Sequence, residues 1–140
     1  MLLGSDWEEA PSLTTSRTDH MCGTMTKTGQ HLILVAGGHN PNSLADCEYL
    51  ILSKMEWQKC KDLPMPLYAA QLVEDPETGD VLLIGGGTNQ DKIYRLSDID
   101  GDWILQDKTL QAPRSQFSAM VIPPGILSCN QFSKTKHDEL

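Results

Sequence analysis

The sequence predicts an all-β fold made of repeated four-stranded antiparallel units. Three observations lead to this prediction. Short apolar runs end in a cluster of glycines, each run is followed in the same order by a tyrosine and a tryptophan, and no stretch of the 140 residues shows helical periodicity. Landmarks that recur at a fixed spacing of about 20–50 residues are the signature of a repeat architecture.

Two copies of this pattern are nearly complete. The landmarks of the first copy are the apolar run 31–36, Gly37, Gly38, Tyr49 and Trp57. The landmarks of the second copy are the run 80–84, the glycines at 85–87, Tyr94 and Trp103. Trp57 precedes Trp103 by 46 residues, and Trp7 precedes Trp57 by 50 residues and is followed by Pro11 and Arg17. All three tryptophans of the chain therefore lie on one repeat lattice.

Each copy contains four expected strands. The first strands are expected at 18–25, 69–74 and 116–122, the second at 31–36 and 81–84, the third at 48–52 and 92–96, and the fourth from Glu56 and from Asp102 onward. The second strands are continuous apolar runs without alternation, which indicates burial on both faces. The turns between first and second strands, 27–30 and 75–80, each contain a glycine that tolerates a positive φ.

Four antiparallel strands that repeat at about 45–50 residues, with glycine and aromatic landmarks, are typical of a β-propeller blade. Paired glycines at the end of a strand let neighbouring backbones approach more closely than a Cβ permits. Tyrosine and tryptophan supply large flat surfaces between stacked sheets. The pattern therefore favours stacked propeller blades.

The pattern resembles the kelch repeat, whose motif is a double glycine, a tyrosine, a tryptophan and an arginine that opens the next unit. The matching positions are Gly37, Gly38, Tyr49, Trp57, Gly86, Gly87, Tyr94, Trp103 and Arg114. Leu67 departs from the motif, because it stands where the arginine is expected.

The resemblance implies a kelch-type β-propeller fragment of four-stranded antiparallel blades. Its expected parts are the last strand of a truncated blade with a linker at 1–17, blades at 18–66 and 67–113, the first strand of a further blade at 114–127, and a polar tail at 128–140. Because propellers close with about four to eight blades, we expect the remaining blades in cis or other copies of the chain in trans.

The resemblance also implies a non-catalytic protein–protein interaction module that binds an unidentified protein partner through loops at one end of the propeller. The loop positions carried over are His39, Asn40, Asn42, Thr88, Asn89, Ser115 and Gln116. Two alternatives stay open. One is a fragment of a propeller enzyme, of the galactose oxidase or sugar-acid epimerase type, with its active residues in missing blades. The other is a scaffold of the endoplasmic reticulum lumen.

The residues themselves show no catalytic, cofactor or metal cluster, so we expect neither an enzyme nor a cofactor. The four histidines are dispersed over the predicted strands, turns and tail. Asp98, Asp100 and Asp102 alternate as in part of a calcium loop, but the glutamate that such a loop requires is missing downstream. A turn at Gly101 explains this segment better.

The charge argues against nucleic acid as a partner. The formal net charge is −8, with 19 acidic and 11 basic residues, whereas phosphate binding needs a concentrated basic face. No apolar run approaches the length of about 18 residues that a membrane-spanning helix needs. We therefore expect neither nucleic acid nor a membrane span.

The four cysteines leave two interpretations open, namely buried free thiols or one disulfide in an oxidising compartment. If Ser53 and Lys54 form a turn between the third and fourth strands, Cys47 and Cys60 lie opposite each other. A cross-strand disulfide between them is then conceivable.

The tail ends in a tetrapeptide that resembles a retention signal of the endoplasmic reticulum, made of His137, Asp138, Glu139 and Leu140. No secretory signal precedes the first strand as the chain is written. The sequence thus indicates a cytoplasmic location, or the secretory pathway if a missing N-terminal part carries a signal peptide.

Overall fold

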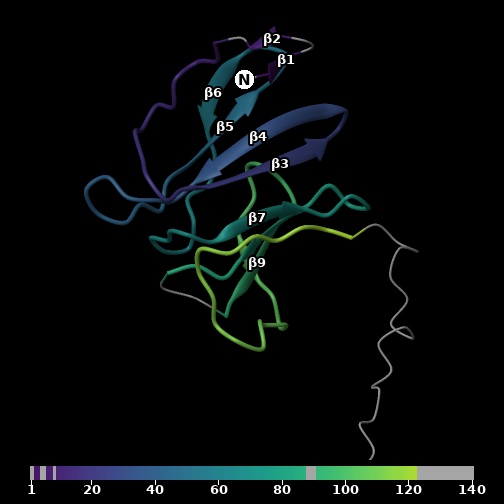
Figure 1. The fold of residues 1–140 in the computed structure, drawn as a ribbon. Coiled ribbons are helices and arrows are strands. Elements are labelled where there is room, and N and C mark those ends of the chain that lie inside the picture. Colours follow the sequence, from purple (N-terminus) through teal and green to yellow (C-terminus); the bar gives the residue numbers. More distant parts are fainter. Residues whose placement is uncertain (1, 4–5, 8, 88–90, 123–140) are drawn as a thin grey trace, which may run out of the picture.

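The structure of the chain, a computed structural model, describes residues 2–3, 6–7, 9–87 and 91–122. The described residues form ten strands and no helix, and eight of these strands make up two four-stranded antiparallel sheets. In each sheet the strands lie in chain order (Figure 1). The prediction of an all-β fold with four-stranded antiparallel sheets is confirmed. None of the described residues belongs to a helix of the length and hydrophobicity that crossing a membrane requires.

The two sheets follow one another along the chain. The first sheet consists of β3 (Met21–Lys27), β4 (Gln30–Ala36), β5 (Cys47–Ile51) and β6 (Glu56–Lys59). The second sheet consists of β7 (Gln71–Glu74), β8 (Val81–Ile84), β9 (Ile93–Leu96) and β10 (Ile104–Leu105). Near the N-terminus, β1 (Leu2–Leu3) pairs with β2 (Asp6–Trp7). The strand expected within 1–17 thus forms a short hairpin of its own.

The hairpin between β3 and β4 shows how local sequence sets the first sheet. Lys27 pairs with Gln30, which leaves Thr28 and Gly29 as the two turn residues, with φ of 49° and 76°. Positive φ at both positions defines the turn that matches the right-handed twist of two paired strands. The expected turn at 27–30 therefore forms where the glycine allows it.

The core lies between the two sheets, because β3 and β7 run side by side (Figure 1). A Cβ at Gly23 of β3 would stand 2.7 Å from the Cβ of Leu72 of β7, so the two strands approach closely. Side chains that are at most 1% exposed come from both sheets and from the segment between them, and they include Met21, Met25, Leu34, Leu67, Val81, Leu83 and Leu96. The contact between the first strands of the two sheets thus organises a common core.

Two tryptophans tie each sheet to the segment that precedes it. The indole nitrogen of Trp57 donates to the carbonyl of Pro11 over 2.8 Å, and that of Trp103 donates to the carbonyl of Lys61 over 3.3 Å. The two tryptophans, which lie on one repeat lattice in the sequence, therefore make the same kind of contact in the structure. Trp7, the third tryptophan of the lattice, is 81% exposed.

Matching hydrogen bonds show which residues of the two sheets correspond. The amide of Gly37 donates to the carbonyl of Asp46 over 3.0 Å, and that of Gly85 donates to the carbonyl of Lys92 over 2.9 Å. Glycines 37–38 therefore correspond to glycines 85–86, and all four have positive φ. The sequence match of 37–38 to 86–87 is shifted by one residue, because a run of three glycines does not show which two end the strand.

The strand register changes the tyrosine match in the same way. Val35 pairs with Glu48, and Leu83, its counterpart in the second sheet, pairs with Tyr94. Tyr94 thus occupies the position of Glu48, and the position of Tyr49 is taken by Arg95. The tyrosines recur in sequence, but they lie on opposite faces of their sheets, because a shift of one residue reverses the face.

The segment 116–122 differs from the expectation of a strand. It runs alongside β7 in Figure 1, yet no residue of it is assigned to a strand. A strand needs a hydrogen-bonded neighbour, and within the described residues this segment has no ladder partner. The segment contains three exposed apolar side chains, Met120, Val121 and Ile122.

We predict that Gly37→Ala destabilises the chain far more than Gly29→Ala. At Gly37 a methyl group would overlap the carbonyl oxygen of Leu67 at a positive φ of 60°, whereas at Gly29 it would meet no atom within 4 Å. We expect a loss of about 3 kcal/mol or more for Gly37→Ala and about 1 kcal/mol for Gly29→Ala. Urea unfolding measures both, and equal losses would contradict the close approach.

Candidate functional site

Three turns that open successive units meet at one end of the molecule. Asp19, Ala69 and Gln116 have φ of 51°, 53° and 53°, although none of them is glycine. The amide of Gln116 donates to the carbonyl of Ala69, and the amide of Ala69 donates to the carbonyl of Asp19, each over 2.9 Å. We call these three residues the turn row. Its members are 50 and 47 residues apart, so the repeat of the sequence is also a repeat in space.

The glycines that end the second strands lie against the turn row. The amide of Gly38 donates to the carbonyl of Leu67 over 2.8 Å, and the amide of Gly86 donates to the carbonyl of Arg114 over 3.1 Å. Leu67 and Arg114 therefore hold equivalent positions two residues before the turn row. Each second strand thus ends on the backbone that opens the next unit.

The loop after β4 packs its histidine on a tyrosine of the next unit. The ring centroids of His39 and Tyr68 are 4.1 Å apart, with an interplanar angle of 48°. His39 also exchanges two backbone hydrogen bonds with Thr18, of 2.9 and 3.1 Å. Gly87 lies against the Tyr68 ring, because a Cβ at this glycine would overlap the ring carbons of Tyr68.

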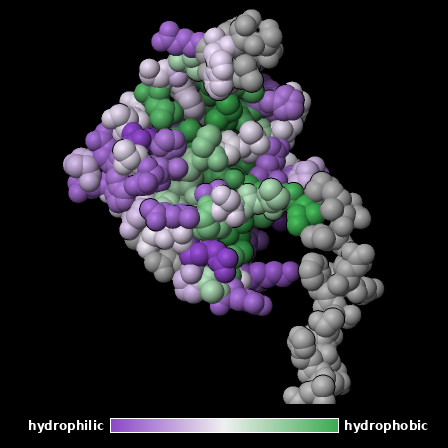
Figure 2. Space-filling view, in the orientation of Figure 1, coloured by the Kyte–Doolittle hydropathy of each residue, from purple (hydrophilic) through white to green (hydrophobic). Residues whose placement is uncertain are grey.

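The structure brings several of the sequence-predicted loop residues to this end. His39, Asn40 and Asn42 share the loop after β4, and Ser115 and Gln116 lie at the turn row. Thr88 and Asn89 fall outside the described residues, as do His137, Asp138, Glu139 and Leu140 of the expected retention signal. Figure 2 shows hydrophilic surface on the side where the loop after β4 projects.

Sequence reasoning missed Tyr68 as a member of this end. It stands one residue before Ala69 and is half-buried between His39 and Gly87. Its place directly after the arginine position of the repeat was the available signal. The role of an aromatic residue at this position becomes clear only from the fold, which packs the loop after β4 against it.

The loop after β4 carries a serine–histidine contact of the kind that can act as nucleophile and base. Ser43 Oγ lies 3.3 Å from His39 Nδ1. Such a pair needs a third group to orient the base, and here the imidazole packs on the ring of Tyr68. The amide of Leu44 donates to the carbonyl of Gly38 over 2.8 Å and closes the same loop. The contact therefore shapes the loop.

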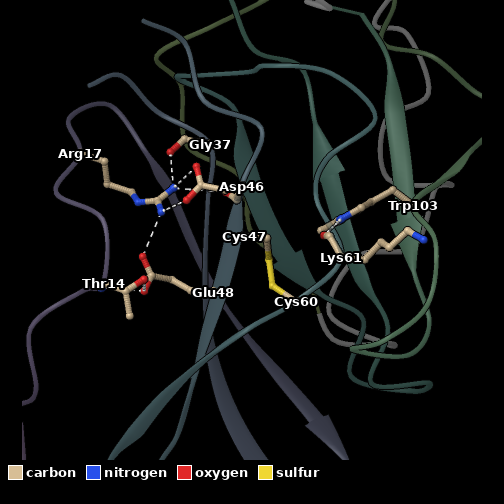
Figure 3. The surroundings of a disulfide bond; sticks show 9 residues. All are labelled: Thr14, Arg17, Gly37, Asp46, Cys47, Glu48, Cys60, Lys61 and Trp103. Atoms are coloured by element: carbon tan, nitrogen blue, oxygen red, sulfur yellow. Dashed lines mark hydrogen bonds and ion pairs between the residues drawn. A yellow bond between two sulfur atoms is a disulfide. The ribbon is translucent and has the colours of Figure 1, made fainter. Parts of the chain in front are cut away.

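A buried ion cluster forms where the first sheet begins (Figure 3). The Arg17 side chain is 0% exposed, and its Nη2 lies 2.6 Å from Asp46 Oδ2 and 2.9 Å from Glu48 Oε1. Its Nη1 donates to the carbonyl of Gly37 over 2.8 Å. Thr14 donates to Glu48 from both its amide and its hydroxyl, each over 2.8 Å. Every charge in the cluster is thereby paired.

Of the two interpretations that the cysteines left open, the structure shows the cross-strand disulfide, which joins Cys47 and Cys60 beside this cluster (Figure 3). The two Cα atoms are 5.2 Å apart, within the usual range for a disulfide. The register of β5 and β6, with Glu48 opposite Lys59, places the two cysteines across from each other. The turn spans 52–55 and not only Ser53 and Lys54, but a symmetric lengthening leaves the register unchanged.

A second buried carboxylate links the two sheets. Asp80 accepts hydrogen bonds from Lys27 Nζ over 2.6 Å, from Arg95 Nε over 2.5 Å and from Ser97 Oγ over 2.9 Å. Burial alone would raise the pKa of Asp80, but the hydrogen bonds from Lys27, Arg95 and Ser97 outweigh burial and lower it to about 2. Since Lys27 ends β3, this carboxylate fastens the first hairpin to the second sheet.

A groove of about 810 Å³ lies along β3 and β7. It is lined by Thr24, Thr26, Glu74, Thr78 and, from the C-terminal segment, Ala119 and Val121. The hydroxyl of Thr24 donates to Glu74 Oε2 over 2.5 Å across it. Within the described part of the chain, no group of three histidine, cysteine or acidic side chains is placed to hold a metal ion.

Two curated proteins that share one name are similar to this chain. No family model matches the chain. A curated protein of Gibberella zeae, named tRNA wybutosine-synthesizing protein 4, is 33% identical over 107 residues, which are 73% of this chain and 10% of that protein. The protein of the same name from Neurospora crassa is 30% identical over 112 residues, 76% of this chain and 9% of that protein. The chain thus spans about a tenth of the length of these relatives.

These relatives correct the functional predictions. The prediction of a non-catalytic protein–protein interaction module, and of no part in an enzyme, is wrong, because both relatives are named for wybutosine synthesis on tRNA. Their names indicate neither a kelch repeat nor protein binding, and neither a propeller oxidase nor a lumenal scaffold. The physical reason for the error is that the chain corresponds to only about a tenth of each relative's length. A stretch equal to a tenth of the relatives' length does not display the catalytic groups of the whole.

We predict that Arg17→Ala destabilises the chain by about 3–5 kcal/mol, because it leaves the Glu48 carboxylate buried without its ion pair. The matched control copies the second sheet, where Leu67, Lys92 and Tyr94 stand at the positions of Arg17, Asp46 and Glu48. The triple variant R17L/D46K/E48Y should recover most of the loss in urea unfolding. If Arg17→Ala were neutral, the cluster would not stabilise the first sheet.

We also predict that stability falls in acid through Asp80. Its folded pKa of about 2 lies below the ordinary value of 3.8 for an aspartate, so its contribution is fully present above about pH 4 and is lost as the pH falls from 4 to 2. The expected contribution is on the order of 1–2 kcal/mol. Asp80→Asn should flatten this part of the stability profile, measured by urea unfolding between pH 2 and 6. An unchanged slope would show that Asp80 is not the group responsible.

Proposed function

We propose that this chain acts in tRNA wybutosine synthesis, as two consecutive blades of a β-propeller within a protein of the relatives' kind. The observation that carries the proposal is the similarity to two tRNA wybutosine-synthesizing proteins, which covers about three quarters of the chain in each case. A contiguous match of 107 or 112 residues within a chain of 140 includes strands of both sheets.

The spatial repeat supports the propeller arrangement. Each sheet is a four-stranded antiparallel meander, as a blade is. The first strands β3 and β7 lie side by side, and the segment 116–122 continues this row. The hydrogen bonds of the turn row connect three successive units at one end. A regular row of first strands is the arrangement expected around a propeller axis.

The charge supports a scaffolding role for these blades within the synthesis. The net charge of −8 disfavours contact with the phosphates of tRNA, because phosphate binding needs a concentrated basic face. The Arg17 cluster directs its guanidinium into the interior, where Asp46 and Glu48 neutralise it. We therefore propose that the blades give the synthesising protein a rigid framework, and that tRNA phosphates are bound elsewhere in it.

The test is the wybutosine content of tRNA in cells that carry this coding segment. Disruption of the segment should abolish wybutosine, measured by mass spectrometry of nucleosides from hydrolysed tRNA. Gly37→Ala should lower the wybutosine content at least fivefold, because the framework is weakened, while Gly29→Ala should leave it within a factor of two. Unchanged wybutosine after disruption would overturn the proposal. Retention of tRNA by the purified chain at physiological salt would overturn the scaffolding role.

A further inference from the structure

One face of the second sheet is the counterpart of a face that is buried in the first. Leu34, Ala36, Cys47 and Tyr49 of the first sheet are at most 9% exposed, because the second sheet packs on them. Their counterparts by register are Leu82, Ile84, Ile93 and Arg95. All four counterparts are only partly buried. The same surface is thus covered in one unit and left partly open in the next.

The open face has the shape and chemistry of a contact surface. A cavity of about 450 Å³ lies on it, lined by Leu82, Ile93 and Arg95 together with residues 106–108. Beside it runs the C-terminal segment, whose Met120, Val121 and Ile122 are 82%, 38% and 46% exposed. Figure 2 shows hydrophobic side chains near the end of this segment. Exposed apolar side chains next to an open sheet face mark an interaction site.

We propose that this face, together with the segment 114–122, binds a third four-stranded antiparallel blade whose third strand carries carboxylates that pair with Arg114. The proposal rests on the propeller part of the proposed function and names what its next blade must contain. The occupant is a blade of this construction, because the second sheet already covers the equivalent face of the first.

The arginine position supplies the chemical requirement. Arg17 and Arg114 are equivalent, and the Nε of each donates to the carbonyl two residues earlier, at Thr15 over 3.3 Å and at Ala112 over 3.4 Å. Arg17 pairs with Asp46 and Glu48, which belong to the third strand region of the unit that Arg17 opens. Arg114 opens the next unit, so its partners belong to the third strand of that unit.

The second unit is the internal comparison. Leu67 replaces the arginine there and is buried, and Lys92 and Tyr94 replace the two carboxylates. Arginine and carboxylates therefore occur together in the first unit and are absent together in the second. Among the described residues Arg114 is exposed and takes part in no ion pair. A guanidinium that a unit buries needs an acidic partner.

The backbone points to the same occupant. Within the described residues the segment 116–122 has no ladder partner, although its counterpart β3 pairs with β4 over seven residues. Gln116 is already held in the turn row by Ala69. The segment is thus placed as a first strand, and a second strand can pair along its free edge.

The experiment supplies the third blade from the chain itself. In a chimera, residues 115–140 are replaced by a copy of residues 18–66, which places the copied Asp46 and Glu48 where partners of Arg114 are required. We expect Arg114→Glu to raise the unfolding equilibrium constant at least 30-fold in the chimera. R114L combined with D46K and E48Y in the copy should restore stability to within threefold, as Leu67 does in the second unit. A folded chimera that is indifferent to Arg114→Glu would overturn the proposal.

The unaltered chain gives a second test that does not depend on the chimera. Arg114→Glu should change its unfolding equilibrium constant by less than threefold, whereas Arg17→Glu should raise it at least 30-fold. Equal effects would mean that Arg114 already has its partner in this chain, and the proposal would fail. A dimer of the chain that Arg114→Glu dissociates would make the occupant a second copy and would also overturn it. Neither result depends on wybutosine, so this proposal and the proposed function fail separately.

Discussion

The close approach between the end of one second strand and the backbone that opens the next unit is the contact on which the arrangement of the chain depends. Gly38 donates to Leu67, and Gly86 donates to Arg114, at positions where a Cβ would collide with neighbouring atoms. These backbone bonds bring the members of the turn row into line and thereby set β3 against β7. The core between the sheets, the loop end and the groove along the first strands all follow from this spacing.

The two units solve the same packing problem with different chemistry. In the first, a buried arginine is neutralised by two carboxylates, and in the second, leucine and tyrosine occupy equivalent positions. A buried ion pair contributes little net stability compared with a well-packed apolar group, but it tolerates only a complementary partner. The exchange suggests that arginine at this position selects its neighbour, while leucine only fills space. This difference makes the arginine that opens the third unit informative about a blade beyond the described residues.

The curated relatives of this acidic chain are named for tRNA wybutosine synthesis. A fold of this kind does not imply a function, since the same architecture serves binding proteins and enzymes alike. Here the buried polar groups are engaged in structure: Arg17 with its carboxylates, Asp80 with Lys27 and Arg95, and His39 with Tyr68. Their chemistry is that of a rigid framework.

The strands that local chemistry controls could be predicted from the amino-acid sequence alone. Thr28 and Gly29 specify the first hairpin, and the apolar runs specify β4 and β8. The register that pairs Glu48 with Lys59 also places Cys47 opposite Cys60. Local pattern was sufficient there, because a hairpin register depends only on its turn and on the alternation beside it.

Which residues of the two units are equivalent became clear only from the hydrogen bonds and strand register of the folded chain. It showed that glycines 85–86 match 37–38, that Tyr94 matches Glu48, and that Tyr68 packs on His39. It also showed the segment 116–122 without a ladder partner in the described part of the chain. These features depend on contacts between residues about 50 positions apart, where a shift of one residue reverses the face of a strand and leaves the sequence pattern nearly unchanged.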